Sequence, residues 1–129
     1  MTRSADSLVD DARRSIERVS PQEAQARAKQ GALLVDIRPE RQRREHGEVP
    51  GALIIERNVL EWRLDPNGEY KLPEATSHER EVLILCQQGY ASSLAAASLT
   101  ALGYTRAGDV IGGFDAWVAA GLPSVRRDL

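Results

Sequence analysis

The sequence predicts one α/β domain built around a parallel sheet, because short apolar runs alternate with helical segments along the chain. The chain has 129 residues, a length that fits a single domain with one core. Several short runs have the apolar composition of strands that are buried on both faces. These runs are residues 32–36, 53–55 and 82–86 and a stretch within 104–111. Alternation of this kind implies parallel strands, right-handed crossovers and helices on both faces of the sheet.

Helices are expected between these runs. Residues 1–17 have apolar side chains at helical spacing and predict an N-terminal helix. Ser20 has the character of an N-cap, with Pro21 at the first helical position and Glu23 completing a capping box, and this second helix should end at Gly31. The remaining predicted helices are residues 38–46, 58–64, 92–102 and 112–121.

Composition and charge argue against several functional classes. A formal net charge of −2 provides no basic field that would recruit nucleic acid or an anionic membrane surface. No apolar run approaches the roughly 20 residues that a membrane span requires, and residues 1–15 lack the apolar segment of a signal peptide. A single cysteine permits no intramolecular disulfide, which suits a reducing compartment. We therefore expect a cytoplasmic protein without a nucleic-acid or membrane partner.

Cys86 has the position of a reactive residue. In open α/β sheets ligands bind beyond the carboxyl ends of the strands, which selects residues 36–38, residues 56–58 and Cys86 with its loop. A glycine-containing loop follows Cys86 and leads directly into a helix, whose unpaired N–H groups favour a nucleophilic thiolate and can cradle an anion or a persulfide. The alternative is that Cys86 is a small apolar side chain that packs at the end of a strand.

Several segments of the chain, in the right order, resemble conserved motifs of the rhodanese family. The segment CQQGYAS resembles the active-site loop of that family, and the others resemble its two N-terminal boxes and its C-terminal signature. The matching segments are residues 34–38 (LVDIR), 47–52 (GEVPGA), 86–92 (CQQGYAS), 112–117 (GGFDAW) and 121–123 (GLP). The resemblance implies a three-layer α/β/α sandwich around a five-stranded parallel sheet. It implies a rhodanese domain over residues 19–125, preceded by a helical extension at 1–18 and followed by a C-terminal tail at 126–129.

The resemblance also implies a thiosulfate sulfurtransferase with Cys86 as its catalytic residue. Cys86 would take sulfane sulfur from a small donor such as thiosulfate, hold it as a persulfide and pass it to cyanide or a thiol, including a thiol on a protein. This chemistry requires no metal and no cofactor, and neither His46 nor His78 has the spacing of a metal ligand. The residues expected to bind the donor are Gln87, Gln88, Gly89, Tyr90, Ala91 and Ser92.

Ala91 occupies a position where many relatives have an arginine that helps to bind an anionic donor, so the substrate is left open. We expect Arg57 to supply the missing charge, because it follows the strand at 53–55 and should lie at the same sheet edge as Cys86. The alternative is that Arg57 is a solvated side chain beside neighbouring glutamates. Asp36 and Arg38 are expected to form an ion pair that braces the loop.

Two other functions are compatible with the motifs. Related phosphatases use a longer loop that ends in arginine six places after the cysteine, and here that position is Ser92, which cannot bind a phosphate in bidentate fashion. A non-catalytic module that binds a protein or senses redox state is favoured by Ala91 and opposed by the intact Cys86. We expect Ser92 and Ser93 to act as helix caps rather than as nucleophiles.

Overall fold

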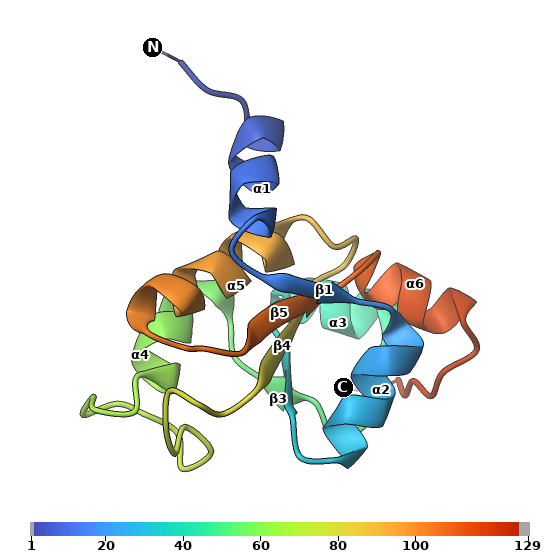
Figure 1. Cartoon of the computed structure of the whole chain (residues 1–129). Helices are drawn as coiled ribbons and strands as arrows, with labels where there is room; N and C mark the ends of the chain where they lie inside the picture. The colour runs from blue at the N-terminus through green and yellow to red at the C-terminus, as the bar shows by residue number, and fades with distance from the viewer. Residues whose placement is uncertain (1, 127–129) are drawn as a thin grey trace.

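Strands and helices alternate along the chain as expected, with one strand more than the apolar runs indicate (Figure 1). The computed structural model describes residues 2–126, so residues 127–129 of the expected tail lie outside the described residues. The elements are α1 (Ala5–Arg13), β1 (Glu17–Val19), α2 (Pro21–Lys29), β2 (Leu33–Asp36), α3 (Glu40–His46), β3 (Leu53–Ile54), the 3₁₀ helix η1 (Arg57–Val59), α4 (Leu60–Leu64), β4 (Val82–Leu85), α5 (Ala91–Leu102), β5 (Ala107–Val110) and α6 (Gly113–Ala119). None of these helices has the length and apolar composition needed to cross a membrane.

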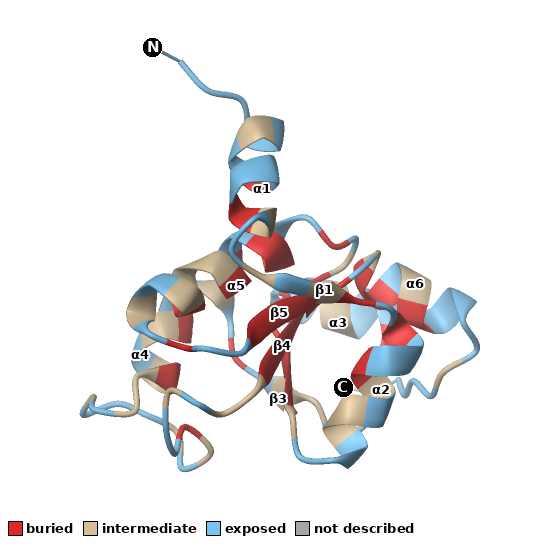
Figure 2. Cartoon of the chain, viewed as in Figure 1, coloured by how far each residue is buried: buried red, intermediate tan, exposed pale blue. Residues whose placement is uncertain are grey.

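The sheet has five strands in the order β1-β5-β4-β2-β3, and every neighbouring pair is parallel. β4 is the central strand, with Val35 of β2 beside Ile84 on one side and Asp109 of β5 beside Ile84 on the other. Every residue of β2, β4 and β5 is buried, as Figure 2 shows in red. The predicted three-layer sandwich around a five-stranded parallel sheet is confirmed.

Two apolar cores fill the space between the sheet and its helices, and β4 contributes to both. Successive side chains of a strand point to opposite faces. Val82 and Ile84 therefore pack in the core that α4 and α5 cover, whereas Leu83 and Leu85 pack in the core that α2 and α6 cover. This double burial explains why the strand is an unbroken apolar run instead of an alternating one.

The first 19 residues are joined to the domain more closely than a separate extension would be. α1 begins at Ser4 with a capping box, buries Val9 and Ala12, and packs along α5. β1 then pairs with β5 at the edge of the sheet, and the expected boundary at residue 18 falls inside this strand. β1 has only three residues, two of them charged, and thus lacks the apolar run by which the other strands were predicted.

Gly108 of β5 allows β1 to approach the sheet. A Cβ atom at Gly108 would lie 2.3 Å from the carbonyl oxygen of Glu17, the residue opposite it in the register. Gly108→Ala should therefore displace β1 and lower the free energy of unfolding by about 1–3 kcal/mol. Urea unfolding measures this change. Gly68→Ala is the control, because an added Cβ there meets only the Asp65 side chain, and equal stability of the two variants would contradict the prediction.

Candidate active site

Cys86 is the first residue after the central strand, and its thiol is free and buried. The backbone N–H groups of Gly89 and Ser92 donate to its Sγ atom, with N···S distances of 3.2 and 3.3 Å. A cysteine that only fills the core has no need of such donors. Two N–H groups directed at one sulfur stabilise negative charge on it, as a thiolate or a persulfide requires.

The Cys86 loop, residues 86–92, curls tightly because glycine allows a close backbone contact with the start of α6. Gly89 has φ +87°, and a Cβ atom there would lie 2.7 Å from the backbone nitrogen of Gly112. On the other side of the contact, a Cβ at Gly113 would lie 2.4 Å from the carbonyl oxygen of Cys86. That oxygen accepts a hydrogen bond from the N–H of Phe114 at 2.8 Å.

A buried ion pair supports the first half of the Cys86 loop. Arg38 is fully buried, binds both carboxylate oxygens of Asp36, and lies 4.2 Å above the ring of Phe114. Its Nη1 atom donates to Oε1 of Gln87 at 2.8 Å, while Nε2 of the same amide donates to Asp115 at 2.7 Å. Both ends of the Gln87 amide are thus bound to protein, so this side chain fixes the loop in place.

A second buried carboxylate supports the other half of the loop. Oδ2 of Asp109, at the end of the sheet, accepts hydrogen bonds from the hydroxyl groups of Ser92 and Ser93, both at 2.8 Å, and Arg18 donates to its Oδ1 at 2.9 Å. The expectation that these serines cap the helix is wrong: Tyr90 is the N-cap residue of α5, and no side chain caps it. Ser92 and Ser93 lie inside the helix, after its N-cap residue, and both hydroxyls donate to the buried carboxylate, which needs donors.

Two arginines from the start of the chain bind the tip of the loop. Nη2 of Arg13 and Nη2 of Arg18 donate to the carbonyl oxygen of Gly89 at 2.9 and 3.0 Å. The Arg13 guanidinium also donates to the Ser93 hydroxyl and lies 5.5 Å from the centre of the Tyr90 ring. Neither arginine could be identified from the sequence, because nothing local to α1 or β1 indicates a contact with residues more than 70 positions away.

The remaining predicted loop residues face solvent. The side chains of Gln88, Tyr90 and Ala91 are exposed. Asp109 was missed, although it carried a signal: it is a charged residue inside the short strand that ends just before Gly112.

Arg57 lies in an ion pair with Glu61, one of the neighbouring glutamates considered above. Its Nη1 atom is 2.9 Å from Oε2 of Glu61, and its side chain is 41% exposed. Burial alone would raise the pKa of Glu61, but hydrogen bonds from the Ser98 hydroxyl and from Arg57 hold that pKa below its ordinary value. Glu61 therefore stays ionised and compensates the Arg57 charge.

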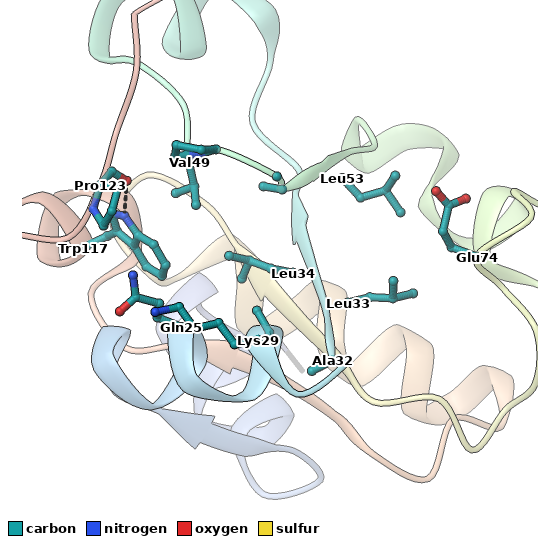
Figure 3. A pocket seen from close by; sticks show the side chains of 14 residues that line it. Gln25, Lys29, Ala32, Leu33, Leu34, Val49, Leu53, Glu74, Trp117 and Pro123 are labelled. Carbon is teal, nitrogen blue, oxygen red and sulfur yellow. Dashed lines mark hydrogen bonds between the residues drawn. The ribbon is translucent and has the colours of Figure 1, made fainter.

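Two further features of the described residues bear on ligand binding. Across residues 2–126, no cluster of three or more His, Cys, Asp or Glu side chains could hold a metal ion. An apolar hollow of about 460 Å³ lies between α2, the start of β2 and Trp117 (Figure 3). Leu33 and Leu34 on its wall are at the opposite end of β2 from Asp36, and no residue of the Cys86 loop lines it.

Comparison with known proteins gives consistent matches over most of the chain. The family model described as the rhodanese-like domain matches residues 20–120. The adenylyltransferase and sulfurtransferase UBA4 of Candida albicans is 31% identical over 102 residues, which are 78% of this chain but only 23% of that protein. Thiosulfate sulfurtransferase GlpE of Haemophilus influenzae is 30% identical over 109 residues, 84% of this chain and 94% of the relative.

A solved structure covers nearly the whole chain. It belongs to a Rhodopseudomonas palustris protein of unknown function, named as a possible tyrosine phosphatase. The two chains are 32% identical, with a TM-score of 0.87 and coverage of 97% of this chain and 96% of the other.

The buried Asp109 carboxylate should be important for stability. Asp109→Asn removes the charge that pairs with Arg18 and lowers the acceptor capacity for Ser92 and Ser93, so we expect a loss of about 2–4 kcal/mol in the free energy of unfolding. Chemical denaturation gives the value. Asp115→Asn is the matched control, since this exposed carboxylate also binds the loop but should contribute less than about 1 kcal/mol. A larger loss of stability in Asp115→Asn than in Asp109→Asn would contradict the structural role assigned to Asp109.

Proposed function

Because the chain belongs to the rhodanese-like domain family, we propose that it is a sulfurtransferase in which Cys86 carries the sulfur atom as a persulfide. The observation that carries this proposal is the pair of backbone N–H groups, from Gly89 and Ser92, that donate to the Cys86 sulfur. Relatives named as sulfurtransferases, including one that aligns over 94% of its own length, support the same reaction class.

The first half-reaction loads the cysteine. The Cys86 thiolate attacks the sulfane sulfur of a donor such as thiosulfate, and a new S–S bond forms. The bond between the two sulfur atoms of thiosulfate breaks, and sulfite leaves with the electron pair. The persulfide that remains is anionic, and the inward N–H groups at Cys86 are suited to bind its charge.

The second half-reaction returns the thiolate. Cyanide or an acceptor thiolate attacks the outer sulfur atom, the S–S bond of the persulfide breaks, and its electron pair stays on Cys86. Thiocyanate or a new persulfide leaves. Neither half-reaction consumes an oxidant or requires a proton to move, so the mechanism needs no general acid or base. We propose the reducing cytoplasm as the compartment, with small thiols or a protein thiol as acceptors.

The donor would enter past the exposed rim of the loop. Gln88, Tyr90 and Ala91 border this entrance, while Gly89 and Ser92 contribute backbone N–H groups. Because these groups already donate to the Cys86 sulfur before the donor arrives, little reorganisation accompanies the attack on the donor.

A phosphatase is the second candidate, because the Rhodopseudomonas palustris relative is named as a possible tyrosine phosphatase. A cysteine phosphatase must bind a phosphate dianion, and a guanidinium at the end of the loop does this in bidentate fashion. The sequence position for that arginine holds Ser92, whose hydroxyl donates to Asp109. The loop therefore supports sulfur transfer better than phosphate transfer.

Replacing the cysteine tests the covalent mechanism. Cys86→Ser should abolish transfer from thiosulfate to cyanide, because a hydroxyl group cannot form the persulfide, while the fold remains intact. Thiocyanate release and circular dichroism are measured together, and mass spectrometry of the wild type after mixing with donor should show one added sulfur at Cys86. Turnover by a folded serine variant would refute the mechanism. A wild type that gains no sulfur from any donor would instead indicate a non-catalytic module.

The phosphatase alternative is tested with an aryl phosphate. Hydrolysis should not exceed the background rate, since no arginine stands at position 92 to bind the dianion. The assay measures aryl alcohol release by the wild type and by Cys86→Ser, beside thiosulfate under the same conditions. Cysteine-dependent phosphate release as fast as sulfur transfer would reverse the ranking of the two functions.

A further inference from the structure

The Cys86 loop contains no lysine, arginine or carboxylate, yet three arginines from other parts of the chain bind it. Arg38 donates to the side chain of Gln87 in the first half of the loop. Arg13 and Arg18 donate to the same carbonyl oxygen, that of Gly89, at the tip. The charge at the site is therefore set by residues outside the loop.

These three arginines differ in how their charge is compensated. Arg38 is paired with Asp36 at 2.8 Å, and Arg18 is paired with Asp109 at 2.9 Å. Arg13 has no ion-pair partner among the described residues. Its contacts are with a hydroxyl group, a carbonyl oxygen and an aromatic ring. Arg13 thus brings an uncompensated positive charge to the loop.

We propose that Arg13 is a positioning residue for the sulfur donor, which it draws to Cys86 with its uncompensated charge while it fixes the peptide after Gly89. This inference rests on the proposed sulfur transfer. It assigns the donor to the class of small anions that carry sulfane sulfur, such as thiosulfate. It also gives a role to α1, which lies outside the segment that the family model matches.

The contact with Gly89 has a consequence for the inside of the loop. The peptide between Gly89 and Tyr90 is trans and planar, so the N–H of Tyr90 points away from the oxygen that the arginines hold. A glycine peptide rotates easily, and a rotated carbonyl would turn its oxygen away from the arginines and towards the other side of the loop. An oxygen on that side, near the N–H groups of Gly89 and Ser92, would repel an anion, and the two arginines oppose this rotation.

The packing of α1 places Arg13 beside the Cys86 loop. It is the last residue of α1, which packs on α5, the helix that begins at the end of the Cys86 loop (Figure 1). Val9 and Ala12, on the buried side of α1, anchor the helix. The side chain of Arg13 is only partly buried, so its field reaches the solvent from which a donor arrives.

Alkylation of Cys86, the only cysteine of the chain, tests the charge without using sulfur transfer. Iodoacetate is an anion and iodoacetamide is neutral, and both react at the same kind of carbon. The measured quantity is the rate constant for iodoacetate divided by that for iodoacetamide. Arg13→Gln should lower this ratio by about twofold to tenfold. A change of this size is expected from one charge several ångströms from the sulfur, at an effective dielectric constant between those of water and protein. Arg13→Lys should retain most of the ratio, and about 1 M NaCl should lower the wild-type ratio towards that of the glutamine variant. The kcat/KM for thiosulfate should likewise fall more in Arg13→Gln than in Arg13→Lys.

Two matched variants separate this role from the alternatives. Arg14→Gln removes the same charge from the next residue, which is exposed and paired with Asp11, and should leave the ratio unchanged. Arg57→Gln tests the arginine that follows β3 and pairs with Glu61.

An unchanged ratio in a folded Arg13→Gln variant would overturn the proposal, as would an equal fall in Arg14→Gln or a fall confined to Arg57→Gln. If the ratio falls as expected but no donor loads Cys86, the proposed function fails while the electrostatic role of Arg13 stands.

Discussion

A loop that directs its N–H groups at a sulfur atom must turn carbonyl oxygens outward, and each outward oxygen needs a donor. The carbonyl of Cys86 receives the N–H of Phe114, and the carbonyl of Gln87 receives the N–H of Asp115. The carbonyl oxygen of Gly89 accepts hydrogen bonds from two guanidinium groups. The arrangement around the loop follows from this need, since the donors come from the start of α6 on one side and from α1 and β1 on the other.

This constraint explains why the site depends on both ends of the chain. Residues 86–92 alone cannot hold their conformation, because the donors that satisfy them lie more than 20 residues later and about 70 residues earlier. β1 adds a strand to the edge of the sheet and carries Arg18 towards the Gly89 carbonyl. Gly113 lets α6 begin against the loop backbone, because a Cβ atom there would collide with the carbonyl oxygen of Cys86. The conformation of the site thus depends on the packing of α1, β1 and α6 around the loop.

The sequence was sufficient for most of the fold and for the position of Cys86 at the end of β4, but not for the surroundings of the loop. The strands at β2 and β4 were predictable because burial on both faces requires unbroken apolar runs. β1 was not, because edge position and the glycine at Gly108, rather than apolar side chains, allow Glu17 and its neighbours to pair. Ser92 and Ser93 matched a local capping rule, but the helix begins before them, and their hydroxyls donate to a buried carboxylate distant in sequence. Local rules cannot weigh partners that only the tertiary structure brings together.

The electrostatics of the site follow from its place in the sheet. Asp36 on β2 lies beside Leu85, and Asp109 on β5 lies beside Ile84, so two buried carboxylates flank the end of β4 just before Cys86. Left unpaired, each would oppose negative charge on the sulfur. Arg38 neutralises one and Arg18 the other, and each of these arginines also holds the loop. Because both carboxylates are compensated, backbone N–H groups and any remaining arginine charge determine whether an anion is attracted to the sulfur. A single unpaired guanidinium at the tip of the loop therefore has a large effect on this attraction.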